Sequence, residues 1–559
     1  MLCRDEPKVR IDMESRKPLN FDWLPLAAVV LPFAIYVAQS LALRGWLMDD
    51  AGITFVYARN LAEGHGLVTQ PGLPPVEGYS NPLWLLVMVP FFWLGLFEPF
   101  LTSKIISVLL VAASFYMMLK IAALASGSRL WPGLLATCLL ATNASFIIWT
   151  SSGLENPLYA CLVVLLTFRL LVATDRTVWV KRDAITCAAI SIGLALTRPE
   201  GILFALAFPT VLLLSTQESI RNQLTLLVQY SAIIVVAIGA FLLFRWLYFG
   251  DLFPNTYYVK GGADWRAVHG LLTMQDTYLT KLSELGTSIF GRHLWLLLPI
   301  GFIAWGTATI IKKEYRRQHA VLLTVTLLAW SAFMLLPSDW MGEFRFATAF
   351  FAMVYLSAAI LFSRLLPSGR SLTVSKIFMG VLVLAGLAGS VTLHYPRLST
   401  WAKQPIVSFA GIAERFGHRY NRWADHLGLK EASLLVPDIG GTLYYSKLRI
   451  YDLAGLTDRT IARTRPNNEQ FEWDIETFYN YVFDTLEPTF IHTHGSFTMR
   501  SQFDMDQRFS RDYVPISEYE DEYASTRLKR KIMSGDYIRR DVAATRIKEL
   551  QEIRDGTVR

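Results

Sequence analysis

The sequence predicts a polytopic α-helical membrane protein that ends in a small α/β domain. Apolar runs of roughly 20 residues, the length a helix needs to cross a bilayer, recur along the first 395 residues. Only 18% of the 559 residues are charged, whereas soluble domains carry about 25%. After residue 395 the composition changes to a mixture of polar residues and short apolar runs, which predicts the separate domain.

The net charge and the cysteines limit the classes of protein to which this sequence can belong. The formal net charge of +7 is modest for this length. In a membrane protein such an excess is typical of cytoplasmic loops and lipid headgroups, so no nucleic-acid partner is expected. The four cysteines show no metal-ligand spacing, and three of them lie in or beside apolar runs. They are therefore interpreted as small core residues and not as a disulfide framework.

Residues 1–23 are mostly polar and mixed in charge, and five basic residues precede the first span, which predicts a cytoplasmic N-terminus. They are Arg4, Lys8, Arg10, Arg16 and Lys17. The first span is expected at about 24–43, and the loop that follows, 44–82, then lies outside. A transmembrane domain of about 11–12 segments extends over 24–395. Its further apolar runs lie at 83–98, 103–125, 130–149, 157–174, 184–197, 201–215, 226–249, 293–311, 320–337, 347–363 and 377–394.

The run at 83–98 is predicted not to cross the membrane. The basic loops 175–183, 217–223, 312–319 and 363–376 should all be cytoplasmic, and they share one side only if this run does not cross. It has only 16 residues and contains Pro90, which is short for a span. We expect it to dip into the membrane and return, or to lie tilted against the first loop. About 11 full crossings and an external C-terminus follow.

Residues 396–559 are predicted to form the extracytoplasmic α/β domain. Short apolar stretches at 434–437, 449–453 and 489–492 are typical of strands, and 438–441 is expected to be a turn. The basic tail from about residue 525 is expected to be a surface helix.

The first outer loop carries the strongest candidate for chemistry, the pair Asp49 and Asp50. Acids at a helix start can simply cap it, but two acids at a lipid–water boundary are costly and indicate a function. One carboxylate can take a proton from an attacking hydroxyl, while the other binds a metal or orients the first. In the same loop Glu77, Tyr79 and Asn81 form either a turn or a sugar-binding cluster. His65 is either a solvated loop residue or a site residue.

Other outward-facing connections carry charged residues that allow two interpretations. Glu155 is either a cap for the next span or a holder of the acceptor or a metal. Arg198 and Glu200 either pair with each other or place an arginine on a lipid phosphate.

Lys260 lies in an aromatic loop and can reach a phosphate on the outer face. Asp339, Trp340 and Arg345 crowd one short turn, in which Arg345 is a candidate phosphate ligand or a snorkelling side chain. Trp340 is a candidate sugar platform.

Six blocks carry a resemblance to a known family: DDAGITFVYARNLAEGHGLV with VEGYSNPLW, SSGLEN, LTRPEG, YFGDLFPNTYYVK, DWMGEFRF, and VPDIGG with YDLAGLTD. In this order they resemble GT-C glycosyltransferases, and the arabinofuranosyltransferase B type of cell-wall assembly in particular. The match spans residues 49–458.

The resemblance implies an inverting transfer of a sugar, with arabinofuranose expected, from a polyprenyl-phosphate donor to a glycan or protein acceptor. It places the site on the outer face of a bacterial cytoplasmic membrane and the base at Asp49 or Asp50, with Asp49 favoured. The sequence shows no required cofactor and leaves a divalent metal possible. Two alternatives stay open: an oligosaccharide polymerase or ligase that uses a lipid diphosphate, and a transporter, although the sequence lacks the internal repeats of transporters.

Overall fold

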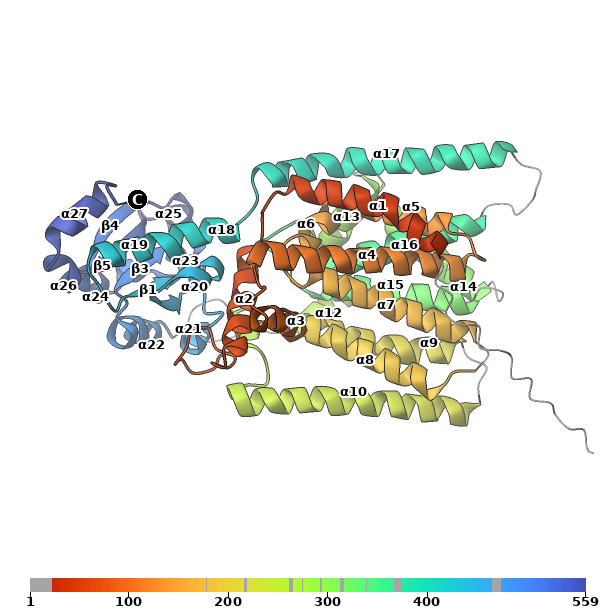
Figure 1. Cartoon of the computed structure of the whole chain (residues 1–559), viewed down its shortest axis with the longest axis horizontal. Helices are drawn as coiled ribbons and strands as arrows, with labels where there is room; N and C mark the ends of the chain where they lie inside the picture. The colour runs from red at the N-terminus through yellow and green to blue at the C-terminus, as the bar shows by residue number, and fades with distance from the viewer. Residues whose placement is uncertain are drawn as a thin grey trace, which may run out of the picture.

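The computed structural model describes residues 23–558 apart from 177, 216–218, 261–264, 274, 292–293, 312–315, 338, 366–372 and 465–473. A long helical bundle and a smaller α/β domain lie end to end (Figure 1). This arrangement confirms the predicted fold class. Of the predicted N-terminal segment 1–23, only Trp23, the first residue of α1, lies within the described residues.

Five helical segments in the described part of the chain are long and apolar enough to cross a membrane, and a sixth results if α5 and α6, which meet at 72°, form one span. The bundle elements are α1 (Trp23–Ala42), α3 (Pro82–Trp93), α4 (Pro99–Ala125), α5 (Trp131–Ala141), α6 (Ala144–Thr150), α7 (Asn156–Asp175), α8 (Lys181–Thr197), η1 (Pro199–Leu206), α9 (Ala207–Ser215), α10 (Ile220–Phe249), α14 (Leu297–Ile311), α15 (Arg316–Leu335), η3 (Arg345–Ala347), α16 (Thr348–Leu365) and α17 (Thr373–Lys403). They coincide with the predicted apolar runs. The predicted boundary at 395 falls inside α17, and the number of full crossings stays a prediction.

The short helix α3 does not run the length of the bundle. Before it, Thr54 Oγ1 donates to Asn81 Oδ1 over 3.2 Å, and at its other end Trp93 Nε1 donates to the carbonyl of Ala62 over 3.0 Å. Both ends are thus tied to one helix, α2 (Asp49–Ala62). At 12 residues α3 is about 18 Å long, too short for a span. The run therefore packs against a helix of the first loop, which agrees with one of the two predicted arrangements, and whether it crosses the membrane stays a prediction.

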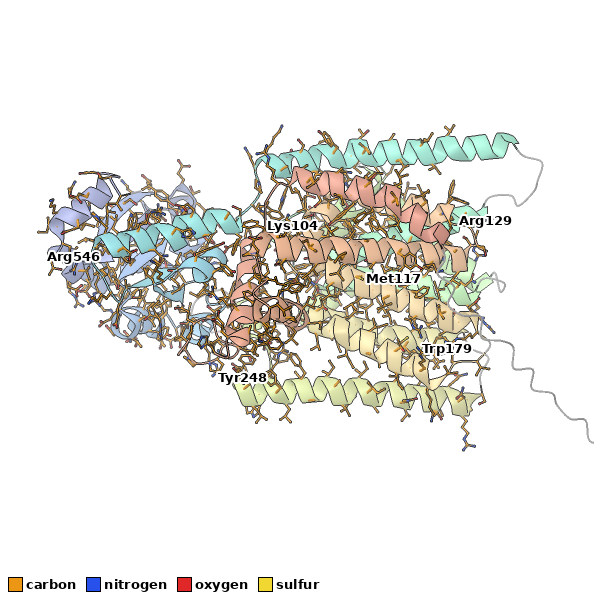
Figure 2. All side chains as sticks on the ribbon, in the orientation of Figure 1. Lys104, Met117, Arg129, Trp179, Tyr248 and Arg546 are labelled. Carbon is orange, nitrogen blue, oxygen red and sulfur yellow. The ribbon has the colours of Figure 1, made fainter. Side chains whose placement is uncertain are left out.

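The predicted outer and inner loops gather at opposite ends of the bundle. Lys104 near the start of α4 and Tyr248 near the end of α10 lie at the end next to the α/β domain, whereas Trp179 lies at the far end (Figure 2). At that far end Arg364 Nη2 donates to Gln318 Oε1 over 2.6 Å, joining two of the loops predicted to be cytoplasmic. Which end faces the cytoplasm stays a prediction.

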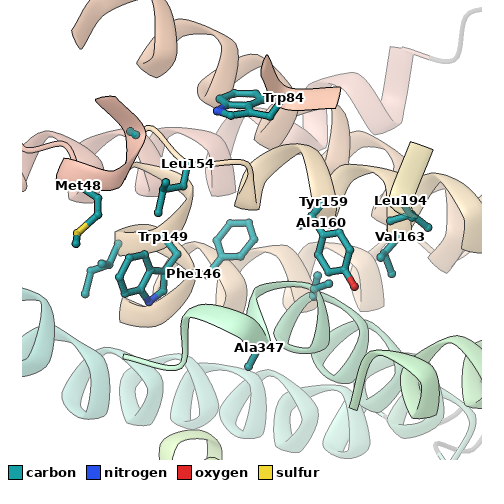
Figure 3. Packing of buried hydrophobic residues seen from close by; sticks show 14 of the residues in the cluster. Met48, Trp84, Phe146, Trp149, Leu154, Tyr159, Ala160, Val163, Leu194 and Ala347 are labelled. Atoms are coloured by element: carbon teal, nitrogen blue, oxygen red, sulfur yellow. The ribbon is translucent and has the colours of Figure 1, made fainter. Parts of the chain in front are cut away.

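Between α10 and α14 the chain forms α11 (Asn255–Val259), α12 (Trp265–Leu272) and α13 (Asp276–Phe290). At the end of the bundle next to the α/β domain, the core beneath the loops includes Met48 at the start of α2, Trp149 in α6 and Leu194 in α8, all fully buried (Figure 3).

The α/β domain contains a five-stranded sheet of order β2-β1-β3-β5-β4. Its strands are β1 (Ser433–Val436), β2 (Arg449–Asp452), β3 (Phe490–Thr493), β4 (Tyr513–Glu520) and β5 (Met533–Arg539). β1 pairs in parallel with β2 and β3, and β5 pairs antiparallel with β3 and β4. The first three strands were predicted and are confirmed. The prediction of a helix from residue 525 is wrong for β5, because pairing on both of its edges holds it extended.

Helices surround this sheet: α18 (Phe409–Ile412), η4 (Ala413–His418), α19 (Arg419–His426), α20 (Gly440–Tyr445), α21 (Arg459–Thr464), α22 (Ile475–Asn480), η5 (Tyr481–Leu486), α23 (Gly495–Ser501), η6 (Phe503–Met505), α24 (Gln507–Asp512), α25 (Glu522–Leu528), α26 (Arg540–Ala544) and α27 (Ile547–Arg554). The predicted turn at 438–441 is corrected at its second half, because Gly440 and Gly441 begin α20.

The two parts meet through α2, which lies across the end of the bundle (Figure 1). Gly52 of α2 and Gly440 of α20 face each other, and a Cβ on Gly440 would lie 1.8 Å from the backbone oxygen of Asp49. Glycine is therefore required for this approach of two backbones. Gln70 adds a second link, since it exchanges two hydrogen bonds with the backbone of Ile450 in β2.

Candidate active site

Hydrogen bonds to Lys104 of α4 and to the turn at 151–152 hold the segment that leads into α2. Lys104 Nζ donates to the backbone oxygens of Trp46 and Ser151, over 2.9 and 2.8 Å. The Met48 N–H donates to the backbone oxygen of Ser152 over 2.9 Å. Asp49 and Asp50 then occupy the first helical turn, where the helix dipole favours negative charge. The acid pair is thus held on a rigid element and not on a free loop.

Asp49 docks the α/β domain. Its two carboxylate oxygens accept hydrogen bonds from the backbone N–H groups of Gly440 and Gly441, over 3.0 and 2.7 Å, and the residue is 3% exposed. Burial raises the pKa of Asp49 well above its usual value, although the hydrogen bond from the Gly441 N–H opposes this rise. Repulsion from Asp438 and Asp50 raises the pKa further. The contacts describe a buried cap on the first turn of α20.

Asp50 faces a charged cluster instead. Its side chain is 32% exposed, and its carboxylate lies 4.0 Å from Arg345 Nη1. Desolvation raises the pKa of Asp50, while the charges of Arg345 and Lys260 oppose this rise. Lys260 follows α11 and is open to solvent, yet desolvation and the charge of Arg345 lower its pKa. The structure therefore brings one accessible carboxylate together with two cations.

Arg345 is held by a strained turn. Gly342, Glu343 and Phe344 have φ values of 70°, 46° and 51°, and left-handed backbone is costly for residues with a Cβ. Hydrogen bonds hold the turn, since the Glu343 carbonyl accepts from Trp149 Nε1 over 2.8 Å. The Arg345 Nη1 lies 3.6 Å from Asp339. Its Nε is buried without a hydrogen-bond partner among the described residues, which leaves one donor of this guanidinium unused.

Arg198 is engaged by other side chains. Its guanidinium donates to Glu155 over 2.6 Å and also bonds Glu200, and it stacks on Phe346 at 4.6 Å. Asn81 donates to the other Glu155 oxygen over 2.9 Å. Although burial alone would raise it, Arg198 and Arg345 hold the pKa of Glu155 below its ordinary value. This network ties two of the guanidinium nitrogens to glutamates, and the role of Arg198 as a phosphate ligand stays a prediction.

Four of the predicted site residues are not brought to Asp50 by any described contact. Glu77 is 3% exposed and forms an ion pair with Arg245 of α10 at 2.8 Å; burial raises its pKa to about 7. Tyr79 is buried edge-on against Tyr57. His65 is solvent-exposed near Glu63, at 3.8 Å, and Trp340 is 68% exposed.

The α/β domain adds two residues that were missed. Asp438 follows β1, and His494 follows β3; His494 Nε2 lies 3.4 Å from Asp438 Oδ2. The charge of Asp50 contributes to the raised pKa of Asp438, about 6, which burial chiefly causes. The pattern His-Thr-His at 492–494 was the only signal for His494 in the sequence. Among the described residues, no group of three or more His, Cys, Asp or Glu is arranged to hold a metal ion.

A family model described as a domain of unknown function (DUF8728) matches residues 410–539. No curated protein matches the chain. Among solved structures, ArnT from Cupriavidus metallidurans bound to undecaprenyl phosphate is 12% identical, with a TM-score of 0.53 over 91% of this chain and 97% of that chain. The oligosaccharyltransferase of Archaeoglobus fulgidus in the apo form is 11% identical, with a TM-score of 0.52 over 85% of this chain and 70% of that chain.

The mycobacterial arabinofuranosyltransferase AftD is 15% identical, covers 78% of this chain and 34% of that chain, and has a TM-score of 0.42, too low to carry an argument about the sugar. The first two likenesses show that the chain has the fold of GT-C membrane glycosyltransferases, which confirms the fold implied by the resemblance.

The two aspartates should differ in what they contribute to stability. In Asp49→Asn an amide NH2 replaces one acceptor oxygen, which leaves a buried N–H without a partner and costs about 1–3 kcal/mol. In Asp50→Asn the change removes a charge whose desolvation outweighs its attraction to Arg345 and Lys260, as the raised pKa of Asp50 indicates, so stability should stay the same or rise. Thermal unfolding of both variants in one detergent measures this difference. Equal unfolding temperatures for the two variants would contradict the docking role of Asp49.

Proposed function

We propose that this chain is an inverting glycosyltransferase that moves a sugar from a polyprenyl-phosphate donor to an acceptor hydroxyl. Asp50 is the general base in this proposal, and Asp49 positions the α/β domain. The single observation that supports it best is the accessible Asp50 carboxylate, 4.0 Å from Arg345, at the junction of the bundle and the α/β domain. The fold shared with ArnT, solved with undecaprenyl phosphate, agrees with a lipid-linked donor.

The reaction needs one base and a site for the departing phosphate. The acceptor oxygen attacks the anomeric carbon of the donor from the face opposite the phosphate. As the new C–O bond forms, the C–O bond to the phosphate breaks and the acceptor proton passes to Asp50. A base in this position contributes roughly 10²–10⁴-fold to the rate. The configuration inverts because the displacement takes a single step.

The lipid phosphate leaves as an anion, so it needs positive charge more than a proton. Arg345 and Lys260 provide that charge, and the buried Nε of Arg345 supplies a hydrogen-bond donor. Arg198, by contrast, binds Glu155 and Glu200, and Glu155 in turn accepts from Asn81. This network forms the layer of side chains beneath the site. Asp339 orients Arg345 from 3.6 Å away.

The finer parts of the proposal come from the resemblance. They are arabinofuranose as the sugar, a bacterial cytoplasmic membrane as the location, and a site that faces the periplasm or exterior. The displacement with Asp50 as base requires no divalent metal, and it does not conflict with one.

Asp50→Asn should abolish transfer, with a fall in rate of roughly 10²–10⁴-fold, because the amide cannot accept the proton. The purified protein, in lipid nanodiscs, is incubated with a panel of polyprenyl-phosphate sugars, and consumption of each donor is followed. The arabinofuranose donor is expected to be consumed by the wild type and by a control variant with a distant surface change, Lys447→Ala. Consumption of no donor by the wild type would refute the proposed function, and full activity in Asp50→Asn would refute the base assignment.

Arg345→Ala should weaken donor use through the phosphate. Loss of one charge-assisted hydrogen bond costs about 1.5–3 kcal/mol, so KM for the donor should rise by roughly tenfold or more. The measurement compares the intact donor with its dephosphorylated polyprenyl alcohol as a competitor. The competitor should bind wild type and variant alike, because it lacks the phosphate. An unchanged KM for the donor in Arg345→Ala would argue against the phosphate contact.

The rate of transfer should fall at both low and high pH. Asp50 must be ionised to accept a proton and its pKa is raised, so kcat/KM should fall, as pH decreases, at a higher pH than for an ordinary aspartate. Lys260 must be protonated and its pKa is lowered, so donor binding should weaken, as pH increases, below the ordinary pKa of lysine. A pH profile of kcat/KM for the donor tests both, and Lys260→Arg should move the alkaline limb upward. An alkaline limb that stays in place in Lys260→Arg would remove Lys260 from the site.

A further inference from the structure

The sheet of the α/β domain has a topological switch point. The chain passes from β1 to β2 on one side of β1, and then returns to β3 on the other side, with all three strands parallel. In open α/β sheets, ligands bind in the crevice beyond the carboxyl ends of the strands where the connections diverge in this way. Asp438 and His494 follow the carboxyl ends of β1 and β3, so they stand on the two sides of this crevice.

A hydrogen-bond chain leads to His494 from the interior of the sheet. Asp536 of β5 accepts from Tyr420 and Ser517, over 2.6 and 2.9 Å. Its carboxylate lies 2.6 Å from His492 Nδ1, and His492 Nε2 lies 3.1 Å from His494 Nδ1. Burial alone would raise the pKa of Asp536, but His492 and Arg419 hold it well below its usual value, so this group is ionised.

The ionised Asp536 fixes the protons along the chain. His492 Nδ1–H donates to Asp536, which leaves His492 Nε2 as an acceptor for His494 Nδ1–H. His494 then presents an unprotonated Nε2 to the crevice. Desolvation lowers the pKa of His494 to about 4, which agrees with a neutral ring. Facing it at 3.4 Å, the ionised Asp438 also accepts hydrogen bonds. Both acceptors are satisfied when two neighbouring hydroxyl groups each donate to one of them.

This crevice adjoins the proposed base. Asp49 binds the N–H groups of Gly440 and Gly441, immediately after Asp438, and so holds the crevice against the start of α2. The charges of Asp50 and Asp438 act on each other. Asp50 therefore has Arg345 and Lys260 on its bundle side. On the side of the α/β domain its charge acts on Asp438, which lies 3.4 Å from His494.

We propose that the crevice between Asp438 and His494 is the acceptor subsite, and that the acceptor is a carbohydrate held by hydroxyl groups next to the one that reacts. The inference rests on the proposed function. A sugar offers neighbouring O–H donors that suit a carboxylate and an imidazole acceptor. Arg415, whose charge acts on Asp438, His492 and His494, can donate to ring oxygens. The Phe497 ring, 5.7 Å from that of His494, offers an apolar face.

The test separates acceptor use from donor chemistry. Nanodisc-embedded protein is given the donor identified by the panel, together with membranes from a strain that lacks this gene as the source of acceptor. Two products are measured: free sugar from hydrolysis of the donor by water, and sugar incorporated into membrane material. His494→Asn keeps a donor to His492 but removes the Nε2 acceptor, whereas His494→Gln places an oxygen near it. His426→Asn is the matched control, since His426 pairs with Glu552 at the surface of the same domain.

In His494→Asn and Asp438→Asn the amount of acceptor membrane needed for half-maximal transfer should rise by about tenfold or more, as expected for one lost hydrogen bond to a charged or buried group. Hydrolysis of the donor and the unfolding temperature should stay near those of the wild type. His494→Gln should recover part of the transfer, and His426→Asn should behave as wild type. Unchanged acceptor dependence, or equal loss of hydrolysis and transfer in folded variants, would overturn the subsite.

The carbohydrate class has its own test. Periodate oxidation of the acceptor membranes, which cleaves neighbouring hydroxyl pairs, should abolish transfer by the wild type, whereas treatment with proteinase K should preserve it. The reverse pattern would identify a protein acceptor and overturn the assignment. A wild type that neither hydrolyses nor transfers any donor would refute the proposed function itself, which distinguishes that failure from a failure of the subsite.

Discussion

The contact on which the rest of the structure depends is the cap that Asp49 places on the first turn of α20. Two hydrogen bonds to backbone N–H groups, at 2.7 and 3.0 Å, join a helix at the end of the bundle to a separate domain almost 400 positions later in the chain. Glycine at 440 permits the approach, because a side chain there would collide with the backbone of Asp49. Together with the link from Gln70 to β2, this junction brings two halves of the candidate site together.

The geometry of a helix explains why two adjacent aspartates can do different work. Successive residues point about 100° apart around the axis, so when Asp49 points at α20, Asp50 points elsewhere, into the cluster with Arg345. Asp49 is 3% exposed and its oxygens are engaged, whereas the Asp50 side chain is 32% exposed. A docking carboxylate and an accessible carboxylate, the proposed base, therefore need no spacer between them.

Arg198 and Arg345 also differ in their surroundings. Arg198 is enclosed by two glutamates and an aromatic ring, which compensates its buried charge and makes it part of the scaffold. Arg345 sits on a turn whose left-handed residues carry strain, held by Trp149 and by the ion pair between Glu343 and Arg397. Strain of this kind persists only where the surroundings enforce it, and here it aims the less satisfied of the two guanidinium groups toward Asp50.

The sequence by itself determined the class of the protein, because apolar runs of spanning length and a low charge content follow directly from the chemistry of the bilayer. It also determined three of the five strands and the acid pair as a candidate centre, and it predicted that 83–98 does not cross. Only the tertiary structure decided which aspartate docks and which faces the site, since adjacent identical residues differ only in direction. It also placed Glu77 and Tyr79 in buried packing, β5 in the sheet, and Asp438, with His494 beside it, within the electrostatic reach of Asp50. These depend on contacts between segments hundreds of residues apart, which no local pattern of residues records.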